Sequence, residues 1–203
     1  MSTAGEIRAS AVARGRAVKR SNVLTATLFG GSLAVLLAKA FSFRPIGFFL
    51  GIVLGLVYSN AFEYLLHRYL LHPLGSSFAK YHLIHHSTWG APDEALYVNF
   101  AKAPWVVMLL FTINAAPFVA AEWAFRAGFA PGVLIGFLVY FLVYEEIHWR
   151  IHLGGWLPSW LQFAQRHHLM HHAGAEERFN VFLPVFDRIA VGLRRFRGTP
   201  GAS

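Results

Sequence analysis

Histidine is the residue type whose number and spacing most clearly point to chemistry in this chain. The sequence contains eleven histidines and no cysteine, so imidazole and carboxylate groups are the strong metal ligands that it offers. No histidine lies before residue 67 or after residue 172. They form four clusters: His67 and His72; His82, His85 and His86; His148 and His152; and His167, His168, His171 and His172. This concentration predicts a metal site.

The spacing inside the clusters matches one face of a helix. Residues three and four apart lie on the same side of a helix, so we expect the three histidines of the second cluster to point the same way, and the last two clusters repeat this spacing. His67 and His72 are five apart and would lie about 140° apart on an ideal helix. Because Pro73 disfavours helical geometry at His72, we expect the chain to bend there and turn both side chains inward.

Ten of these histidines exceed the ligand number of a single ion, because even octahedral coordination uses six. The sequence therefore predicts two ions. We expect His167 to be either a further ligand or a hydrogen-bond partner of a ligand. The ten predicted ligands are His67, His72, His82, His85, His86, His148, His152, His168, His171 and His172.

Zinc, copper, iron and nickel all bind imidazole, which leaves the metal open. A structural zinc ion needs four ligands, whereas a pair of iron ions would use the surplus and keep positions open for oxygen. Neutral imidazoles leave the charge of the ions uncompensated, so carboxylates that orient the ligands should matter. The candidates are Glu63, one turn before His67, and Glu145 and Glu146, just before His148.

The elements that position the clusters are predicted to be transmembrane helices. The chain is 56% hydrophobic and only 14% charged, whereas a water-soluble domain has about 25% charged residues. A span needs about 20 mostly apolar residues. Four stretches qualify: Val23 to about Phe43, Ile46 to about Leu66, Pro104 to about Phe125, and a stretch that starts after Pro131-Gly132 and runs to about His152. We expect an all-α integral membrane protein, two helical hairpins with a histidine-rich helical cap, although hydropathy leaves a partly re-entrant hairpin open.

Lysine and arginine predict the orientation in the membrane. Fifteen of the eighteen lie in residues 1–22, 63–103 and 148–203, and the positive-inside rule places these segments, both termini and every histidine on the cytoplasmic side. We expect residues 1–22 to be a disordered basic tail and residues 23–199 to form one membrane domain. The net charge of +8 suits an anionic membrane surface, and the apolar, aromatic composition argues against a nucleic-acid partner.

Two further segments combine apolar and polar residues. One follows Trp156 and contains Trp160 and Leu161. In the other, near the C-terminus, apolar and basic residues alternate with helical spacing: Phe186, Ile189 and Leu193 with Arg188, Arg194 and Arg195. Each segment either lies flat against the lipid headgroups or packs on the rest of the cap.

At these residues the sequence resembles the fatty acid hydroxylase superfamily of membrane di-metal oxygenases, which includes the sterol desaturases. Its closest likeness is to fatty acid 2-hydroxylases. The similarity covers roughly residues 46–195 and rests on four motifs, with two shorter matches at Pro92-Asp93 and Phe186-Asp187. The motifs are Glu63 to His72, His82 to His86, Tyr144 to His152, and Arg166 to His172.

The resemblance implies a membrane enzyme with two iron ions that activates O2 and inserts one oxygen atom into a lipid C–H bond. It implies a fatty-acyl substrate oxidised near its carboxyl end, and zinc can stand in for iron in isolated protein. Residues 1–22 do not match the haem-binding electron-transfer domain of eukaryotic relatives, so we expect a separate ferredoxin or cytochrome donor. The histidines hold the metal, and no separate catalytic side chain is expected.

Two alternatives remain at this point. A sterol or carotenoid oxygenase or desaturase would use the same chemistry, and the motifs do not fix the substrate. A non-catalytic zinc-bearing membrane protein is an alternative of another class. Metal transport would favour polar residues within the spans, which the apolar runs almost lack.

Overall fold

The computed structural model describes residues 2–73, 79–174 and 178–198, with side chains up to residue 193. These residues form helices and no β-strand, as predicted. The elements are α1 (Ala4–Thr25), the π-helix η1 (Ala26–Gly30), α2 (Gly31–Ala40), α3 (Pro45–Leu66), the π-helix η2 (His67–Leu71), α4 (Ala79–Ser87), the 3-10 helix η3 (Glu94–Leu96), α5 (Pro104–Phe125), α6 (Ala130–Leu153), the 3-10 helix η4 (Ser159–Leu161), α7 (Gln162–His172) and α8 (Val185–Gly198).

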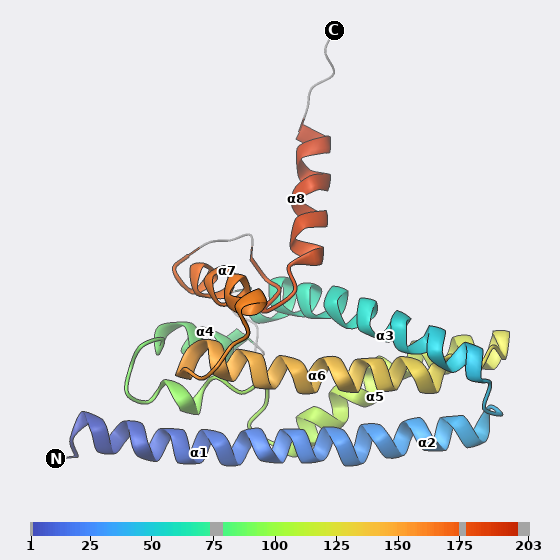
Figure 1. Cartoon of the computed structure of the whole chain (residues 1–203), viewed down its shortest axis with the longest axis horizontal. Coiled ribbons are helices and arrows are strands. Elements are labelled where there is room, and N and C mark those ends of the chain that lie inside the picture. Colours follow the sequence, from blue (N-terminus) through green and yellow to red (C-terminus); the bar gives the residue numbers. More distant parts are fainter. Residues whose placement is uncertain (1, 74–78, 175–177, 199–203) are drawn as a thin grey trace, which may run out of the picture.

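Four helices are long and apolar enough to cross a membrane, which confirms the predicted number. They cover Ala4–Ala40, Pro45–Leu71, Pro104–Phe125 and Ala130–Leu153. Large apolar side chains on their outer faces are exposed, for example those of Leu28, Phe49 and Ile113, as expected where the solvent is lipid. The last of these helices is the most buried and lies among the other three (Figure 1).

Helices α3 and α6 cross at very short distance because glycines face backbone at the contact. A Cβ atom on Gly55 would lie 2.3 Å from the carbonyl oxygen of Val133, and one on Gly132 would lie 2.0 Å from that of Phe48. Gly51 and Gly136 complete two small-xxx-small pairs, one on each helix. Such pairs let membrane helices approach closely, and this contact holds the two histidine-bearing spans together.

The basic N-terminal segment is helical, which differs from the disordered tail that we expected. Thr3 and Glu6 form a capping box at the start of α1, and the helix runs through residue 22 without a break. It also packs on the rest of the chain: Asn99 donates to the carbonyl of Gly15, and Lys19 pairs with Glu146 at 2.7 Å. These contacts and the good helix formers in the segment outweigh its lack of apolar residues. The expected domain end at residue 199 lies outside the described residues.

One end of the bundle carries the histidines. In Figure 1, α4, η3, α7, the start of α1 and the end of α6 gather at that end, and α8 projects away from the bundle, crosswise to α3 and α6. The loops of the two hairpins, after Ala40 and after Phe125, lie at the opposite end. The predicted cap is therefore present, built on the ends of the second and fourth spans.

Candidate metal centre

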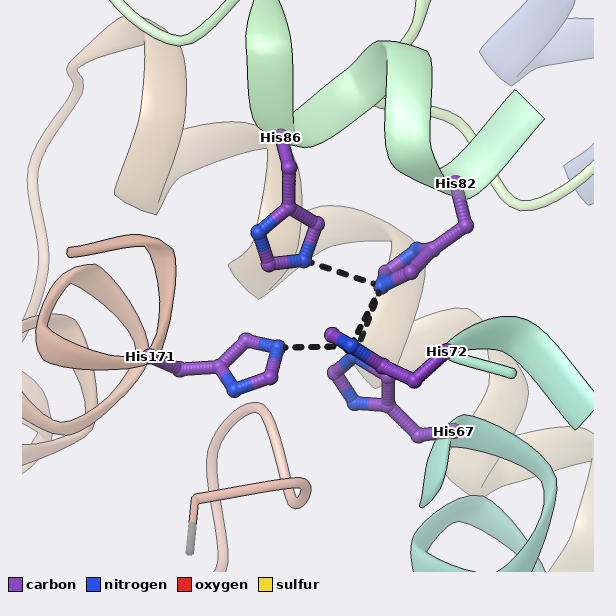
Figure 2. A group of neighbouring side chains, drawn as sticks. All are labelled: His67, His72, His82, His86 and His171. Carbon is purple, nitrogen blue, oxygen red and sulfur yellow. Dashed lines mark hydrogen bonds between the residues drawn. The ribbon is translucent and has the colours of Figure 1, made fainter. Parts of the chain in front are cut away.

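Ten of the eleven histidines converge into two groups of five. Within each group, one ring nitrogen from every residue lies within 4.8 Å of the others. Histidine group A is His67, His72, His82, His86 and His171, and histidine group B is His85, His148, His152, His168 and His172. Figure 2 shows the five rings of group A pointing into one shared space from η2, its following residue, α4 and α7. The ten are the same residues that the spacing singled out.

Helices α4 and α7 each serve both groups. His82 and His86 of α4 belong to group A, and His85 between them belongs to group B. Because each residue advances the helix by 100°, residue i+3 lies to one side of residue i around the helix and residue i+4 lies to the other side. The three side chains therefore diverge by about 100°, which differs from the expectation that they point the same way. Helix α7 has the reverse division: His168 and His172 belong to group B, and His171 between them belongs to group A.

A π-helical turn brings His67 and His72 together. Residues His67–Leu71 form η2, in which i→i+5 hydrogen bonding stacks residues five apart on one side of the helix. The chain bends at His72 and Pro73, directly after η2, but His72 keeps helical dihedral angles, φ −97° and ψ −28°, so the expected loss of helical geometry at His72 is not seen. The wider turn, rather than a break, produces the convergence.

The nitrogen–nitrogen distances in group A are too crowded for hydrogen bonding alone. Nε2 of His82 lies 2.8 Å from Nε2 of His67, 3.1 Å from that of His72 and 3.0 Å from that of His86. A neutral imidazole nitrogen carries one N–H or one lone pair, so it cannot satisfy three such neighbours. In group B the same crowding occurs at Nε2 of His168, which lies 3.0, 3.0 and 3.2 Å from those of His148, His152 and His172.

A cation held between the rings would account for this crowding. Two nitrogens that each lie about 2.0–2.1 Å from one ion, at right angles, are about 3.0 Å apart. The observed distances of 2.8–3.2 Å match that separation. His85 gives a second indication, because it is 2% exposed and neither of its ring nitrogens has a hydrogen-bond partner in the described part of the chain. Leaving such groups unpaired is costly, and a metal ion would satisfy one of them. Each group can hold a metal ion.

Burial keeps these imidazoles in the form that binds metal. Removal from water lowers the pKa of His86 to about 4, and the neighbouring His72 and His152 add to the shift. Burial, followed by the charges of nearby histidines, likewise lowers the pKa values of His82, His85 and His168 well below the usual range. Because a metal ligand must be neutral imidazole, the groups are ready to bind cations at neutral pH.

Outer hydrogen bonds fix the orientation of individual rings. Nδ1 of His152 donates to Oε1 of Glu94 at 2.7 Å, and the buried Glu94 also accepts from the backbone N–H of Gly90 at 3.0 Å. Nδ1 of His67 donates to the carbonyl oxygen of Phe179. Both bonds leave Nε2 to face the group interior. Glu94 was not predicted from the sequence, since it lies 58 residues from its partner and outside every spacing pattern.

His167 lies outside both groups. Its Nε2 donates to Oδ2 of Asp187 at 3.0 Å, and Asp187 also accepts from the backbone N–H groups of Phe179 and Asn180, each at 2.9 Å. His167 therefore supports the loop whose Phe179 carbonyl accepts the hydrogen bond from His67. Of the two expected roles, this is closer to hydrogen-bond support of a ligand than to metal ligation.

The three carboxylates proposed from sequence make other contacts. Glu63 accepts from the hydroxyl of Tyr140 at 2.5 Å and from the N–H of Val181 at 2.8 Å, so it braces the same loop. Glu145 accepts from Phe100 N–H at 2.9 Å and from Asn22 at 3.4 Å. Glu146 pairs with Lys19 and Arg150, at 2.7 and 2.6 Å. The carboxylate that orients a member of a histidine group is that of Glu94, through its contact with His152.

An apolar cleft leads from the spans to group A. It lies among α3, α5 and α6 and is lined by aromatic and aliphatic side chains that include Phe62, Leu110, Phe137 and Phe141. Its histidine end is formed by His67 together with Glu63, Leu66, Leu71 and Tyr144. The cleft therefore places apolar side chains of the membrane-spanning helices next to one histidine group.

Comparison with known proteins gives one match. The family model described as fatty acid hydroxylase matches residues 52–191, which include all eleven histidines, Glu94 and Asp187. No curated protein and no solved structure matches the chain.

Proposed function

Because the chain belongs to the fatty acid hydroxylase family, an integral membrane family of oxidoreductases, we propose that it hydroxylates a lipid C–H bond with O2. The reaction consumes the C–H bond, one O2, two electrons and two protons, and it yields the alcohol and one water. The observation that carries the proposal is the meeting of ten converging histidines, five of them buried, with an apolar cleft that ends at His67.

Two iron ions are the proposed cofactor, one in each histidine group. When bound there, iron would supply the O2 chemistry that no side chain of the cleft can supply. Five imidazoles in each group exceed the four that a structural zinc ion uses and fall one short of six-fold coordination. This donor number supports a redox site over a structural one.

The chain's own residues position the substrate and exclude water. Phe62, Phe137 and Phe141 give the cleft walls that suit an acyl chain, and the bundle around them keeps the tail in an apolar environment. The cleft meets His67 at the end of the second span, where the polar head of a lipid would reach the interface. We therefore propose a fatty-acyl chain, oxidised near its carboxyl end, as the substrate.

Lipid analysis tests the proposal. The chain is expressed in a host that lacks hydroxylated lipids, with iron and a reducing system supplied, and total lipids are examined by mass spectrometry. We expect an acyl product heavier by one oxygen atom, and we expect His85→Ala and His171→Ala to abolish both product and bound metal. Lys80→Ala, an exposed change on α4, is the control that should keep both.

The products also separate the alternatives. If the product is a desaturated acyl chain, or an oxidised sterol or carotenoid, the protein has another activity that uses the same chemistry. Full metal content with no oxidised lipid under any supplied reductant would reject catalysis and favour a zinc-bearing protein without enzymatic activity.

The electron donor and the membrane side are further parts of the proposal. The basic residues around the histidine end favour a cytoplasmic location for that end and for both termini, where a ferredoxin or cytochrome could deliver electrons. Since the chain has no cysteine, Lys80→Cys gives one reactive thiol. A membrane-impermeant maleimide should label it in inverted vesicles and not in intact cells, and the reverse pattern would place the site outside.

A further inference from the structure

Helix α8 carries an apolar stripe that nothing in the described part of the chain covers. Val185, Ile189 and Leu193 are 50%, 46% and 56% exposed. They are four residues apart, so they lie on one face of the helix. Beyond its first turn the helix projects from the molecule (Figure 1). A water-soluble surface would not favour three large aliphatic side chains in a row, so this face needs a partner.

The opposite face of α8 is held by the histidine end of the molecule. Asp187 is 3% exposed and accepts hydrogen bonds from His167 on α7 and from the loop before α8. At 100° per residue, Ile189 lies about 160° around the helix from Asp187. In Figure 1, α7 lies to the left of α8, and most of the length of α3 and α6 lies to its right. The stripe therefore faces the side of the membrane-spanning segments.

The position of α8 along the bundle matches the membrane boundary. Its base is tied to the second span about three turns before that span ends, because Asn60 of α3 donates to the carbonyl oxygen of Leu183 at 2.7 Å. That span ends at Leu71, and its final turns present Leu65, Tyr69 and Leu70 to the outside. Aromatic and aliphatic residues at such a level are typical of the interface between hydrocarbon and headgroups. A helix running crosswise there lies in the plane of the membrane.

The charge of α8 identifies the kind of surface. Arg188 is exposed and lies about 100° around the helix from Ile189, off the apolar stripe. The sequence of the helix contains three more basic residues, Arg194, Arg195 and Arg197, and its one acidic residue is the buried Asp187. An apolar face with the exposed Arg188 beside it, on a helix whose sequence is rich in arginine, fits anionic lipid headgroups above acyl chains.

We propose that α8 lies flat on the membrane at the histidine end, with Val185, Ile189 and Leu193 in the acyl region and its arginines on anionic headgroups. This docking does not depend on the oxygenase activity. It would also anchor the loop from Phe179 to Val181, because Asp187 in the first turn of α8 binds that loop, and the loop in turn contacts His67 and Glu63.

Spin labelling in nanodiscs tests the orientation. The absence of cysteine allows one nitroxide at Ile189→Cys and, as the matched control, one at Arg188→Cys, in the full-length protein. We expect the label at 189 to be accessible to O2 and shielded from a water-soluble nickel chelate, and the label at 188 to show the reverse. Equal nickel access at both positions would overturn the proposal, as would an immobilised label at 189 that neither reagent reaches, which indicates a protein partner.

Lipid composition tests the charge. With phosphatidylglycerol in the nanodisc, the label at 189 should lie deeper than in phosphatidylcholine alone, and high salt should remove the difference because it screens the arginines. A depth that is the same in both lipids would reject anionic binding. Both variants must elute as monodisperse protein and keep metal content equal to the unsubstituted chain before their spectra are compared.

Discussion

Oε1 of Glu94 lies 2.7 Å from Nδ1 of His152, so a carboxylate from a loop helix orients an imidazole from the fourth span. This bond fixes the tautomer that leaves Nε2 free to face group B. In the described part of the chain, this is the direct contact between a carboxylate and a histidine of group A or group B.

Loss of the Glu94 carboxylate is expected to weaken metal binding at group B. Glu94→Ala removes the acceptor for His152 Nδ1–H, and outer partners of this kind contribute about 10–100-fold in metal affinity. Competition with a chelator, followed by elemental analysis, measures the change. The neighbouring Asp93→Asn is the control. Equal affinities in the two variants would show that the bond does not support binding.

Substitution of His85 is expected to have opposite effects with and without metal. His85→Leu removes two buried nitrogens that lack hydrogen bonds, so the metal-free protein should gain stability, on the order of 1 kcal/mol. The metal-loaded protein should lose stability because group B loses a ligand. Thermal unfolding in detergent, before and after metal addition, measures both. Destabilisation of the metal-free form would mean that His85 has a partner of another kind.

The metal-free protein is expected to become less stable in mild acid. The pKa of His86 is about 4 in the fold, against about 6.5 in an unfolded chain. Between these values the unfolded state binds more protons, so stability is full above pH 6.5 and falls as the pH drops toward 4. Unfolding midpoints across this range, with chelator present, test the sign. His86→Gln should flatten the curve.

The crossing of α3 and α6 is expected to tolerate no side chain at Gly132. Gly132→Val would push a branched side chain against the backbone of Phe48 and Ile52, and overpacking of this kind costs about 1–3 kcal/mol or more. Gly31→Ala on α2 is the control, because a Cβ atom there meets nothing within 4 Å. It should leave the unfolding temperature unchanged or raise it slightly. A similar midpoint for both variants would mean that the helices can separate without cost.

Narrowing of the cleft is expected to change the product without changing metal content. Leu110→Trp fills the cleft among α3, α5 and α6, so long acyl chains should be oxidised less, by about tenfold if their misplacement raises the activation barrier by about 1.4 kcal/mol. Leu109→Trp, on the exposed side of α5, is the matched control. Lipid mass spectrometry resolves the chain lengths. Identical product profiles would show that the substrate binds elsewhere.

Local patterns allowed much of this molecule to be predicted from sequence. Hydropathy and proline gave the third span with the bounds that the structure shows, Pro104 and Phe125. Spacing of three and four residues grouped eight of the ten converging histidines into their clusters, since that relationship is set within single helices. Their role as ligands stays a prediction that the metal analyses above will test.

Relationships between distant segments were beyond the sequence. The division of α4 between groups A and B depends on where α6 and α7 sit, and the contact of Glu94 with His152 bridges 58 residues. The helical N-terminal segment was missed for the same reason: Asn22 is buried by Ala101 and Glu145, and neither partner is near it in sequence. The π-turn at His67 has no simple sequence signal.

Because α4 and α7 are shared between the two histidine groups, the geometry of one group is coupled to the geometry of the other. Each helix delivers side chains to both groups, and the rings of His86 and His172, one from each group, stack at 4.1 Å between centroids. A shift of either helix displaces donors on both sides at once. A substitution that moves α4 or α7 is therefore expected to disturb both histidine groups, and the two groups are expected to be kept or lost together.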